Sequence, residues 1–412
     1  MWSLRLNNLH RSFFGALCLL LPVQLGAHFW PNFAYVMGLR IDYLAPTIYL
    51  TDLLVVVILG LWGLDCWRIR ELRITNYELR KYWWILAVFV LLLAGSLLAQ
   101  NQRAALYKFA KIAEFSLLGL YVAKSRETRD VIRKTLSIAV LYSSLIALVQ
   151  FFKQSSLGDL FWWLGERTFT VATPGIAKAV VNGELLMRPY ATFSHPNALA
   201  GFLLVGLILT LPYFLQRHKL FTIPYTLFPI LAIALSFSRS VWLVGLLVAF
   251  FCLFRKKKFF LVISYLLLVI SCLLLVTSYS ADEAISQRLQ LIKAAVLMIQ
   301  GNLLAGVGLN NFLVRLPEFW GPIGTTFWLQ PVHNIYLLIA AETGLTGLLV
   351  FLWFLVLTFK KLSILHSPLS IALGAILLLG LADHYWLTLQ QNQLLFALVL
   401  GLSWEGQRGL KS

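Results

Sequence analysis

Residues 331–347 read PVHNIYLLIAAETGLTG and open an apolar run long enough to cross a bilayer as one helix. Three small residues, Ala340, Gly344 and Gly347, recur at helical spacing, and His333 falls on the same helical face. Small residues let helices approach closely, so we expect this face to turn toward a helix bundle rather than lipid. His333 would then lie at the water boundary, either as a functional group or as an interfacial residue that ends the span.

The composition of the whole chain is that of a polytopic membrane protein. Of its 412 residues 60% are hydrophobic and only 12% are charged, with a mean hydropathy of +0.80. Soluble domains are about 45–50% apolar and about 25% charged. The net charge of +17 could indicate nucleic-acid binding, but basic cytoplasmic loops explain it more simply and no nucleic-acid-binding motif is present. We therefore expect the bilayer as a partner and no nucleic acid.

The apolar runs predict an all-α fold with about twelve transmembrane helices in a single membrane domain, residues 1–412. The runs cover approximately 12–29, 46–66, 82–99, 104–123, 135–152, 196–215, 222–236, 240–254, 259–278, 332–359, 368–386 and 392–405. They divide the chain into N-terminal helices (1–152), a first outer loop (153–195), central helices (196–278), a second outer loop (279–331) and C-terminal helices (332–412).

The beginning of the chain and its cysteines receive simple interpretations. Residues 1–27 resemble a signal peptide, but the many spans that follow favour an uncleaved first helix. The four cysteines lie in or beside apolar runs without metal-ligand spacing, so we expect them to be small buried side chains.

The distribution of basic residues predicts the topology. Region 222–254 could be one long span or a tight pair of helices. A single span would place Arg217 and Lys219 on the opposite side of the membrane from the basic run 255–258, which the positive-inside rule disfavours. We therefore predict two short helices that meet at the outer face around SFSRS (236–240), with both termini in the cytoplasm.

The two long outer loops carry features that suit a membrane surface. The first contains Phe161, Trp162 and Trp163, aromatic residues typical of the lipid headgroup level. The second is predicted to contain an amphipathic surface helix over 285–300, with Arg288 on the flank of its apolar stripe. The stripe consists of Ile285, Leu289, Ile292, Val296 and Ile299.

Under this topology seven charged or titratable residues gather on the outer face: Arg188, His195, Arg239, Arg288, His333, Asp383 and His384. Each one alone could be a loop, turn or capping residue. Together they suit a substrate that bears phosphate, because arginine binds phosphate through two donors and histidine can accept a proton from a hydroxyl. The sequence contains no paired-carboxylate motif or His/Asp spacing typical of a divalent metal site, so we expect metal-independent chemistry.

Several segments of the chain resemble a known family. HNIYLLIAAETGLTG fits the histidine-asparagine, nine residues, glycine, two residues, glycine pattern of the O-antigen ligases through His333, Asn334, Gly344 and Gly347. The segments RPYATFSHPNALAGF, SFSRS, GVGLNNF and DHYWLTLQQ also resemble the O-antigen ligase and polymerase superfamily. The resemblance covers roughly residues 185–390.

The resemblance implies a membrane glycosyltransferase in the bacterial cytoplasmic (inner) membrane. Its donor would be a glycan on undecaprenyl diphosphate at the outer (periplasmic) face, and its acceptor a hydroxyl of a glycan, lipid or protein. His333 would be the general base, and Arg188, Arg239 and Arg288 would bind the leaving diphosphate. Transfer would invert the anomeric centre without a metal or nucleotide cofactor. We also expect four residues to support the site, with the roles of the two histidines left open: Asn334, His195, Asp383 and His384. Gly344 and Gly347 would be structural residues of the motif.

Two alternatives stay open at the level of sequence. A polysaccharide polymerase of the same superfamily would share these motifs, because the acceptor-binding loops are the least readable part. A transporter or flippase of a lipid-linked glycan would also fit many spans and buried cations, but it is expected to show repeated halves and helices broken at mid-membrane. The gathering of polar residues at one face favours the transferase.

Overall fold

The computed structural model describes residues 2–69, 76–125, 128–217, 219–256, 281–320, 329–362 and 367–405. The protein is mostly helical, with short strands and turns between the helices. The helices are α1 (Trp2–Leu19), α2 (Leu50–Ile69), α3 (Asn76–Leu98), α4 (Gln102–Lys124), α5 (Thr128–Lys153), α6 (Pro196–Arg217), α7 (Lys219–Leu235), α8 (Arg239–Lys256), α10 (Ala281–Gly301), α11 (Phe312–Phe319), α12 (Ile335–Lys361), α13 (Pro368–Leu379), α14 (Tyr385–Thr388) and α15 (Gln390–Ser403), with two 3₁₀ helices, η1 (Asn32–Ala34) and η2 (Asp159–Leu164).

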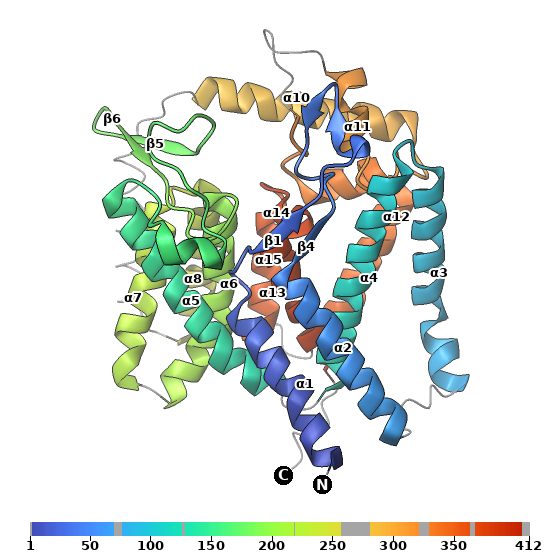
Figure 1. The fold of residues 1–412 in the computed structure, drawn as a ribbon, viewed down its shortest axis with the longest axis horizontal. Helices are drawn as coiled ribbons and strands as arrows, with labels where there is room; N and C mark the ends of the chain where they lie inside the picture. The colour runs from blue at the N-terminus through green and yellow to red at the C-terminus, as the bar shows by residue number, and fades with distance from the viewer. Residues whose placement is uncertain are drawn as a thin grey trace.

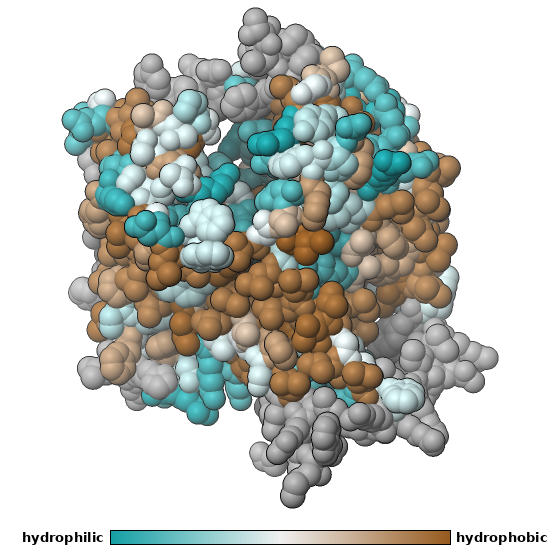
Figure 2. All heavy atoms as spheres, viewed as in Figure 1, coloured by the Kyte–Doolittle hydropathy of each residue, from teal (hydrophilic) through white to brown (hydrophobic). Residues whose placement is uncertain are grey.

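The long helices run between two ends of the molecule, and α10 lies across one of these ends (Figure 1). Among the described residues, four helices are long and apolar enough to cross a membrane: Leu50–Trp67, Thr128–Lys153, Pro196–Arg217 and Ile335–Lys361. Figure 2 shows apolar side chains in a broad band around the helices and polar ones toward the ends. The mostly helical membrane fold is thus confirmed, whereas the number of about twelve spans stays a prediction. The predicted span at 259–278 lies outside the described residues.

The described part of the chain also contains three short antiparallel strand pairs between the helices, which the sequence did not predict. They are β1 (Gly26–His28) with β4 (Thr47–Tyr49), β2 (Tyr35–Val36) with β3 (Leu39–Arg40), and β5 (Lys178–Val181) with β6 (Glu184–Met187). Consequently the apolar run predicted at 12–29 is not one helix: α1 ends at Leu19 and residues 26–28 are a strand. Hydropathy alone cannot distinguish the helix from the strand, because both segments are apolar.

The region 222–254 forms two helices, as the charge pattern predicted. Helix α7 ends at Leu235, and α8 begins at Arg239. Between them Phe237 adopts a positive φ of 51°, which turns the chain. The Trp242 indole donates a hydrogen bond to the Ile233 carbonyl (2.9 Å), so the two helices are tied together beside the turn.

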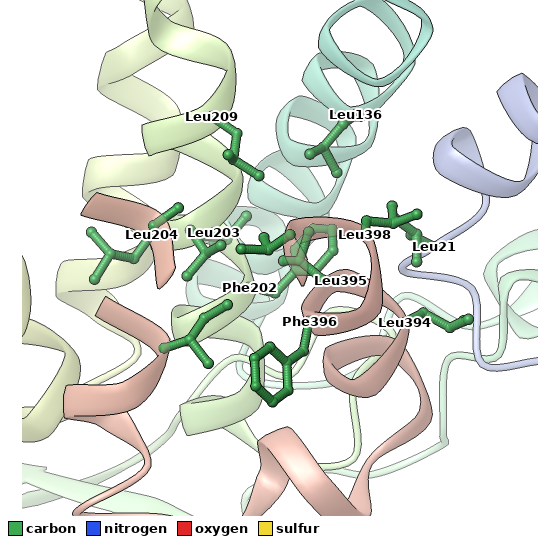
Figure 3. Close-up of a cluster of buried hydrophobic side chains, with 14 of the residues drawn as sticks. Leu21, Leu136, Phe202, Leu203, Leu204, Leu209, Leu394, Leu395, Phe396 and Leu398 are labelled. Atoms are coloured by element: carbon green, nitrogen blue, oxygen red, sulfur yellow. The ribbon is translucent and has the colours of Figure 1, made fainter. Parts of the chain in front are cut away.

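Helix α6 is the centre of the main hydrophobic core. Its residues from Pro196 to Leu207 are all buried, as expected for a helix that is apolar all round. It packs against α5, α7 and α13. Figure 3 shows Phe202 and Leu203 of this helix beside Leu395 and Leu398 of α15. The first turn of α6 is therefore a rigid support for any residue that it carries.

A second core lies under α10. Its buried side chains come from the N-terminal loop, from α10 and α11, and from the beginning of α12. Helix α10 covers the range of the predicted amphipathic helix, but it packs through Leu291, Ala295 and Met298. Leu289 and Ile292, from the predicted stripe, are exposed. Whether this exposed side meets a membrane surface stays a prediction.

Helix α12 is broken at Gly344, where φ is 70° and ψ is −179°. A neighbouring segment, 303–308, fills the break with its own backbone. Val307 N donates to Ala341 O (2.8 Å), and Leu345 N donates to Leu303 O (2.8 Å). These bonds satisfy polar groups that the break would otherwise leave unpaired. Gly344 of the motif is therefore required because the backbone of segment 303–308 approaches it closely. The sequence had suggested close packing between helices instead.

The structure also corrects the predicted position of His333. Helix α12 begins at Ile335 and Asn334 is its N-cap, so His333 precedes the helix and does not share a helical face with Ala340 and Gly347. The break at Gly344 further interrupts the seven-residue spacing. His333 nevertheless lies at the end of the span, where the sequence placed it.

Replacement of Gly344 by alanine should strongly destabilise the protein. An added Cβ would collide with the Leu304 carbonyl, at a positive φ that already costs an alanine about 1 kcal/mol. Gly374→Ala in α13 is the matched control, because an added Cβ there meets nothing within 4 Å. Thermal unfolding in detergent should show a clear loss for Gly344→Ala only. Equal melting temperatures for the two variants would contradict the described break.

Candidate active site

The candidate active site lies where α12 begins and α13 ends. Ile335 N donates to the Gly380 carbonyl (2.8 Å), and the Asn334 side chain donates to the Leu381 carbonyl (3.1 Å). These bonds join two segments that are far apart in the sequence. As a result the rings of His333 and His384 contact each other edge to face, with centroids 5.1 Å apart.

Asn334 serves the backbone of this junction. Its Oδ1 accepts hydrogen bonds from the backbone amides of Tyr336 and Leu337, both at 2.9 Å, and so caps α12. Its Nδ2 is used by the Leu381 carbonyl. The asparagine of the HN motif thus orients the residue before it, and its own polar atoms are already engaged within the protein.

A buried amide on α5 holds the loop that carries Arg188 and His195. Gln150 Oε1 accepts from the backbone amides of Tyr190 (3.0 Å) and Ala191 (2.7 Å), and Gln150 Nε2 donates to the Ala191 carbonyl (3.0 Å) and to Glu166 (2.6 Å). The loop is therefore tied to a core helix. The same loop includes the β5–β6 turn, which places Arg188 directly after a strand.

Arg188 is held by two hydrogen bonds. Its Nε donates to the Ser236 carbonyl (2.6 Å) in the α7–α8 turn, and one terminal nitrogen donates to Asn197 Oδ1 (2.6 Å). Burial lowers the pKa of Arg188 to about 10, and the nearby charges of Arg288 and Arg239 act in the same direction. The guanidinium therefore stays charged at neutral pH, and both of the other predicted arginines lie close enough to influence it.

Asp383 and His384 form the other half of the cluster, and both are buried. Asp383 Oδ2 accepts from Asn197 Nδ2 (2.9 Å), and Asp383 Oδ1 accepts from the backbone amide of His384 (2.8 Å). Burial would raise the pKa of Asp383, but the neighbouring histidines and the bond from Asn197 outweigh burial and lower the pKa to about 2. Asp383 is therefore a carboxylate at neutral pH.

The three histidines of the cluster are neutral at neutral pH. Burial lowers the pKa of His195 and of His384 to about 3, and burial also lowers the pKa of His333, with Asp383 opposing and Arg288 reinforcing that shift. Burial has this effect because it penalises the charged imidazolium. The Nδ1 atom of His333 is buried and has no hydrogen-bond partner among the described residues.

A cation could be held by part of this cluster. His333, Asp383 and His384 each offer one ligand atom, and these atoms lie within 4.8 Å of one another. We did not expect such a group from the sequence, because His333 lies in a different segment from Asp383 and His384. Two histidines and one carboxylate can bind several divalent metals. However, both Asp383 oxygens already accept hydrogen bonds, and His384 Nδ1 contacts Thr388 Oγ1 at 2.7 Å.

The structure brings together the predicted residues Arg188, His195, His333, Asp383 and His384, with Arg239 and Arg288 within range of their charges. Asn334 lies at the edge of this cluster. Gly344 and Gly347 lie further along α12 and support the fold instead.

Three further residues reach the cluster that the sequence analysis missed. Asn197 joins Arg188 to Asp383. The ring of Tyr43, from the N-terminal loop, contacts that of His384 (centroids 5.6 Å apart). Lys108 of α4 donates to the Leu387 carbonyl in α14. Only Lys108 left a signal, since a lysine inside an apolar run marks a candidate functional position.

Helix α14, which directly follows His384, lies toward the end of the molecule that carries the loops and α10 (Figure 1). The face shown in Figure 2 is hollowed near that end. Fold and cluster together define a helical membrane protein with a cationic, histidine-containing site at one end of its helices. Residues 224–352 match the model of a protein family described as O-antigen ligase. Over this segment the match confirms the resemblance to the O-antigen ligase and polymerase superfamily that the sequence predicted.

The family match includes Arg239, Arg288 and His333 but not Arg188 or Asp383. Arg188 and Asp383 lie outside the matched segment in the sequence, but the structure joins both of them to it. No curated protein matches the chain.

We predict that His195 and His384 remain neutral down to about pH 5, because their pKa is lowered and a proton is gained only below it. Nitrogen-15 NMR of histidine-labelled protein in detergent micelles would measure this directly. Protonation of either residue close to the ordinary value of 6.5 would contradict the described burial.

Proposed function

We propose that the protein is a glycosyltransferase that moves a glycan from undecaprenyl diphosphate to an acceptor hydroxyl at the outer face of the bacterial cytoplasmic membrane. The observation that carries this proposal is a cluster in which the charges of Arg239 and Arg288 act on Arg188, and Arg288 also acts on a neutral His333. Fixed cations favour a leaving diphosphate, and a neutral imidazole can accept a proton. The O-antigen ligase match supports the same class of reaction.

In the proposed reaction the acceptor oxygen attacks the anomeric carbon of the donor sugar. His333 Nε2 takes the hydroxyl proton while the new carbon–oxygen bond forms. The bond between the anomeric carbon and the diphosphate oxygen breaks, and its electron pair leaves with the lipid diphosphate. Attack from the opposite face inverts the anomeric centre. The arginines stabilise the charge that develops on the diphosphate, so they favour the transition state over the bound substrate.

Asp383 would support His333 as a fixed negative charge. It raises the pKa of His333 against the effect of burial, and it would stabilise the imidazolium that forms during transfer. We propose that no metal takes part, because the arginines already supply the positive charge that a cation would bring. The His333, Asp383 and His384 grouping makes this point testable with a chelator.

The same observations bear on two alternative functions, a polymerase and a transporter. A polymerase would use the same residues and differ only in its acceptor, a second lipid-linked glycan. A transporter is favoured by one feature, the break in α12 at Gly344. The backbone of 303–308 fills that break, and the polar cluster lies at one end of the helices, which favours the transferase.

The decisive assay measures transfer by purified protein in detergent, with an undecaprenyl-diphosphate-linked oligosaccharide as donor and a chelator present. Wild type should form product, and His333→Ala should lose at least about 100-fold in rate, as expected for loss of a general base. His28→Ala is the control, because His28 is exposed on β1 outside the cluster. Product size separates polymer growth from single transfer. Full activity of His333→Ala would exclude His333 as the base, and loss of wild-type activity with chelator would exclude metal independence.

Arg239→Lys should lower the rate by about tenfold or more, because a lysine retains the charge but cannot form a two-donor contact with phosphate. Arg239 is the first residue of α8 and is exposed at that helix end, so the protein should remain folded. Initial rates at several donor concentrations would measure the effect. A wild-type rate for Arg239→Lys would indicate that the residue only begins the helix.

A further inference from the structure

We propose that Asn197 is a positioning residue that keeps Arg188 and Asp383 apart, so that neither charge is paired with the other and both remain available for the reaction. This inference rests on the proposed function, because it concerns how the same site is held ready for a diphosphate. It assigns a role to a residue outside the HN-x9-GxxG motif and outside the matched segment 224–352.

The hydrogen bonds around Asn197 determine its orientation. Arg188 can only donate, so the Asn197 atom that it contacts at 2.6 Å must be the amide oxygen. A carboxylate can only accept, so the Asn197 atom 2.9 Å from Asp383 Oδ2 must be the amide nitrogen. A neutral amide can accept from a cation and donate to an anion at once.

Asn197 is held firmly enough to act as a spacer. It is the second residue of α6, at the beginning of the most buried helix that could cross a membrane. Its backbone amide donates to His195 Nδ1 (3.1 Å), so it also fixes that ring. The next residue, Ala198, is also held in place, because Nδ2 of Asn392 in α15 donates to its carbonyl (3.1 Å). Asn197 thus connects the arginine, the carboxylate and one histidine to a rigid element.

The spacing matters because a direct contact between Arg188 and Asp383 would cancel both charges. In a buried site an arginine–carboxylate pair is strong and is lost only at a high cost. A diphosphate would then have to displace the carboxylate before it could bind. With an amide in between, Arg188 keeps the donors of its other terminal nitrogen for the substrate, and Asp383 remains beside the histidines.

A charge swap between positions 197 and 383 tests this role. Asn197→Asp places a second carboxylate beside Asp383 and pairs it with Arg188. The double variant N197D/D383N restores every hydrogen bond. Its carboxylate at position 197 would accept from Arg188 and from the new amide at position 383, whose oxygen would accept from His384 N. Only the location of the negative charge differs, since it now lies directly against Arg188.

We expect Asn197→Asp to lower both the melting temperature and the donor affinity. The double variant should recover the wild-type melting temperature in detergent, yet its KM for donor should stay raised by about tenfold or more, as for a lost charge-assisted contact. Asn182→Asp is the matched control. It adds the same charge at the exposed β5–β6 turn, where φ is positive and aspartate is tolerated, and it should leave both quantities unchanged.

Two results would overturn the proposal. Recovery of donor KM together with melting temperature in the double variant would show that Asn197 is only a structural link. Failure of the double variant to recover its melting temperature would show that the hydrogen-bond assignment is wrong. Binding of a short-chain polyprenyl diphosphate, followed by calorimetry, separates this question from the proposed function. If wild type transfers no glycan but binds this ligand, the proposed function fails while the comparison of the variants by affinity still decides the role of Asn197.

Discussion

The high cost of burying charge among apolar helices governs the arrangement of this site. Arg188 and Asp383 lie beside a helix that is buried along its first three turns. Charged groups persist in such a place only if hydrogen bonds replace their contacts with water. Neutral amides provide much of that replacement: Asn197 contacts both charges, and Gln150 holds the loop that carries the arginine. The amides satisfy the charges without neutralising them, which leaves the site reactive.

The same requirement explains why the site forms where helices begin and end. Backbone amides at the beginning of α12 need acceptors, and Asn334 and the Gly380 carbonyl supply them. That solution brings His333 to His384. The α7–α8 turn similarly offers the Ser236 carbonyl to Arg188. The hydrogen bonds that complete the beginning of α12 and the α7–α8 turn therefore also position His333 and Arg188. The rigid core beneath fixes these side chains relative to one another.

Sequence patterns predicted those features that depend on local physics. Apolar length located most of the helices, the position of basic residues predicted the α7–α8 pair, and clustering of arginines and histidines at one face anticipated the site. Prediction failed where structure depends on individual contacts. The position of His333 on a helical face was wrong because Asn334 caps the helix one residue later. The strands β5 and β6 were missed although Asn182 and Gly183, both at positive φ, form a recognisable hairpin turn. Asn197 and Tyr43 could not be found, since nothing in their local sequence reveals a partner distant in the chain.

The central claim is that the arginine and histidine cluster is the binding site of a lipid-linked diphosphate. The most direct measurement is a structure of the protein with a short-chain polyprenyl diphosphate bound. We expect the diphosphate to lie within hydrogen-bond distance of Arg188 and Arg239. His333 should lie beside the position of the departing sugar, and the Arg188–Asn197–Asp383 contacts should remain intact. A diphosphate bound at the opposite end of the helices, or one that breaks the contact between Asn197 and Arg188, would contradict this expectation.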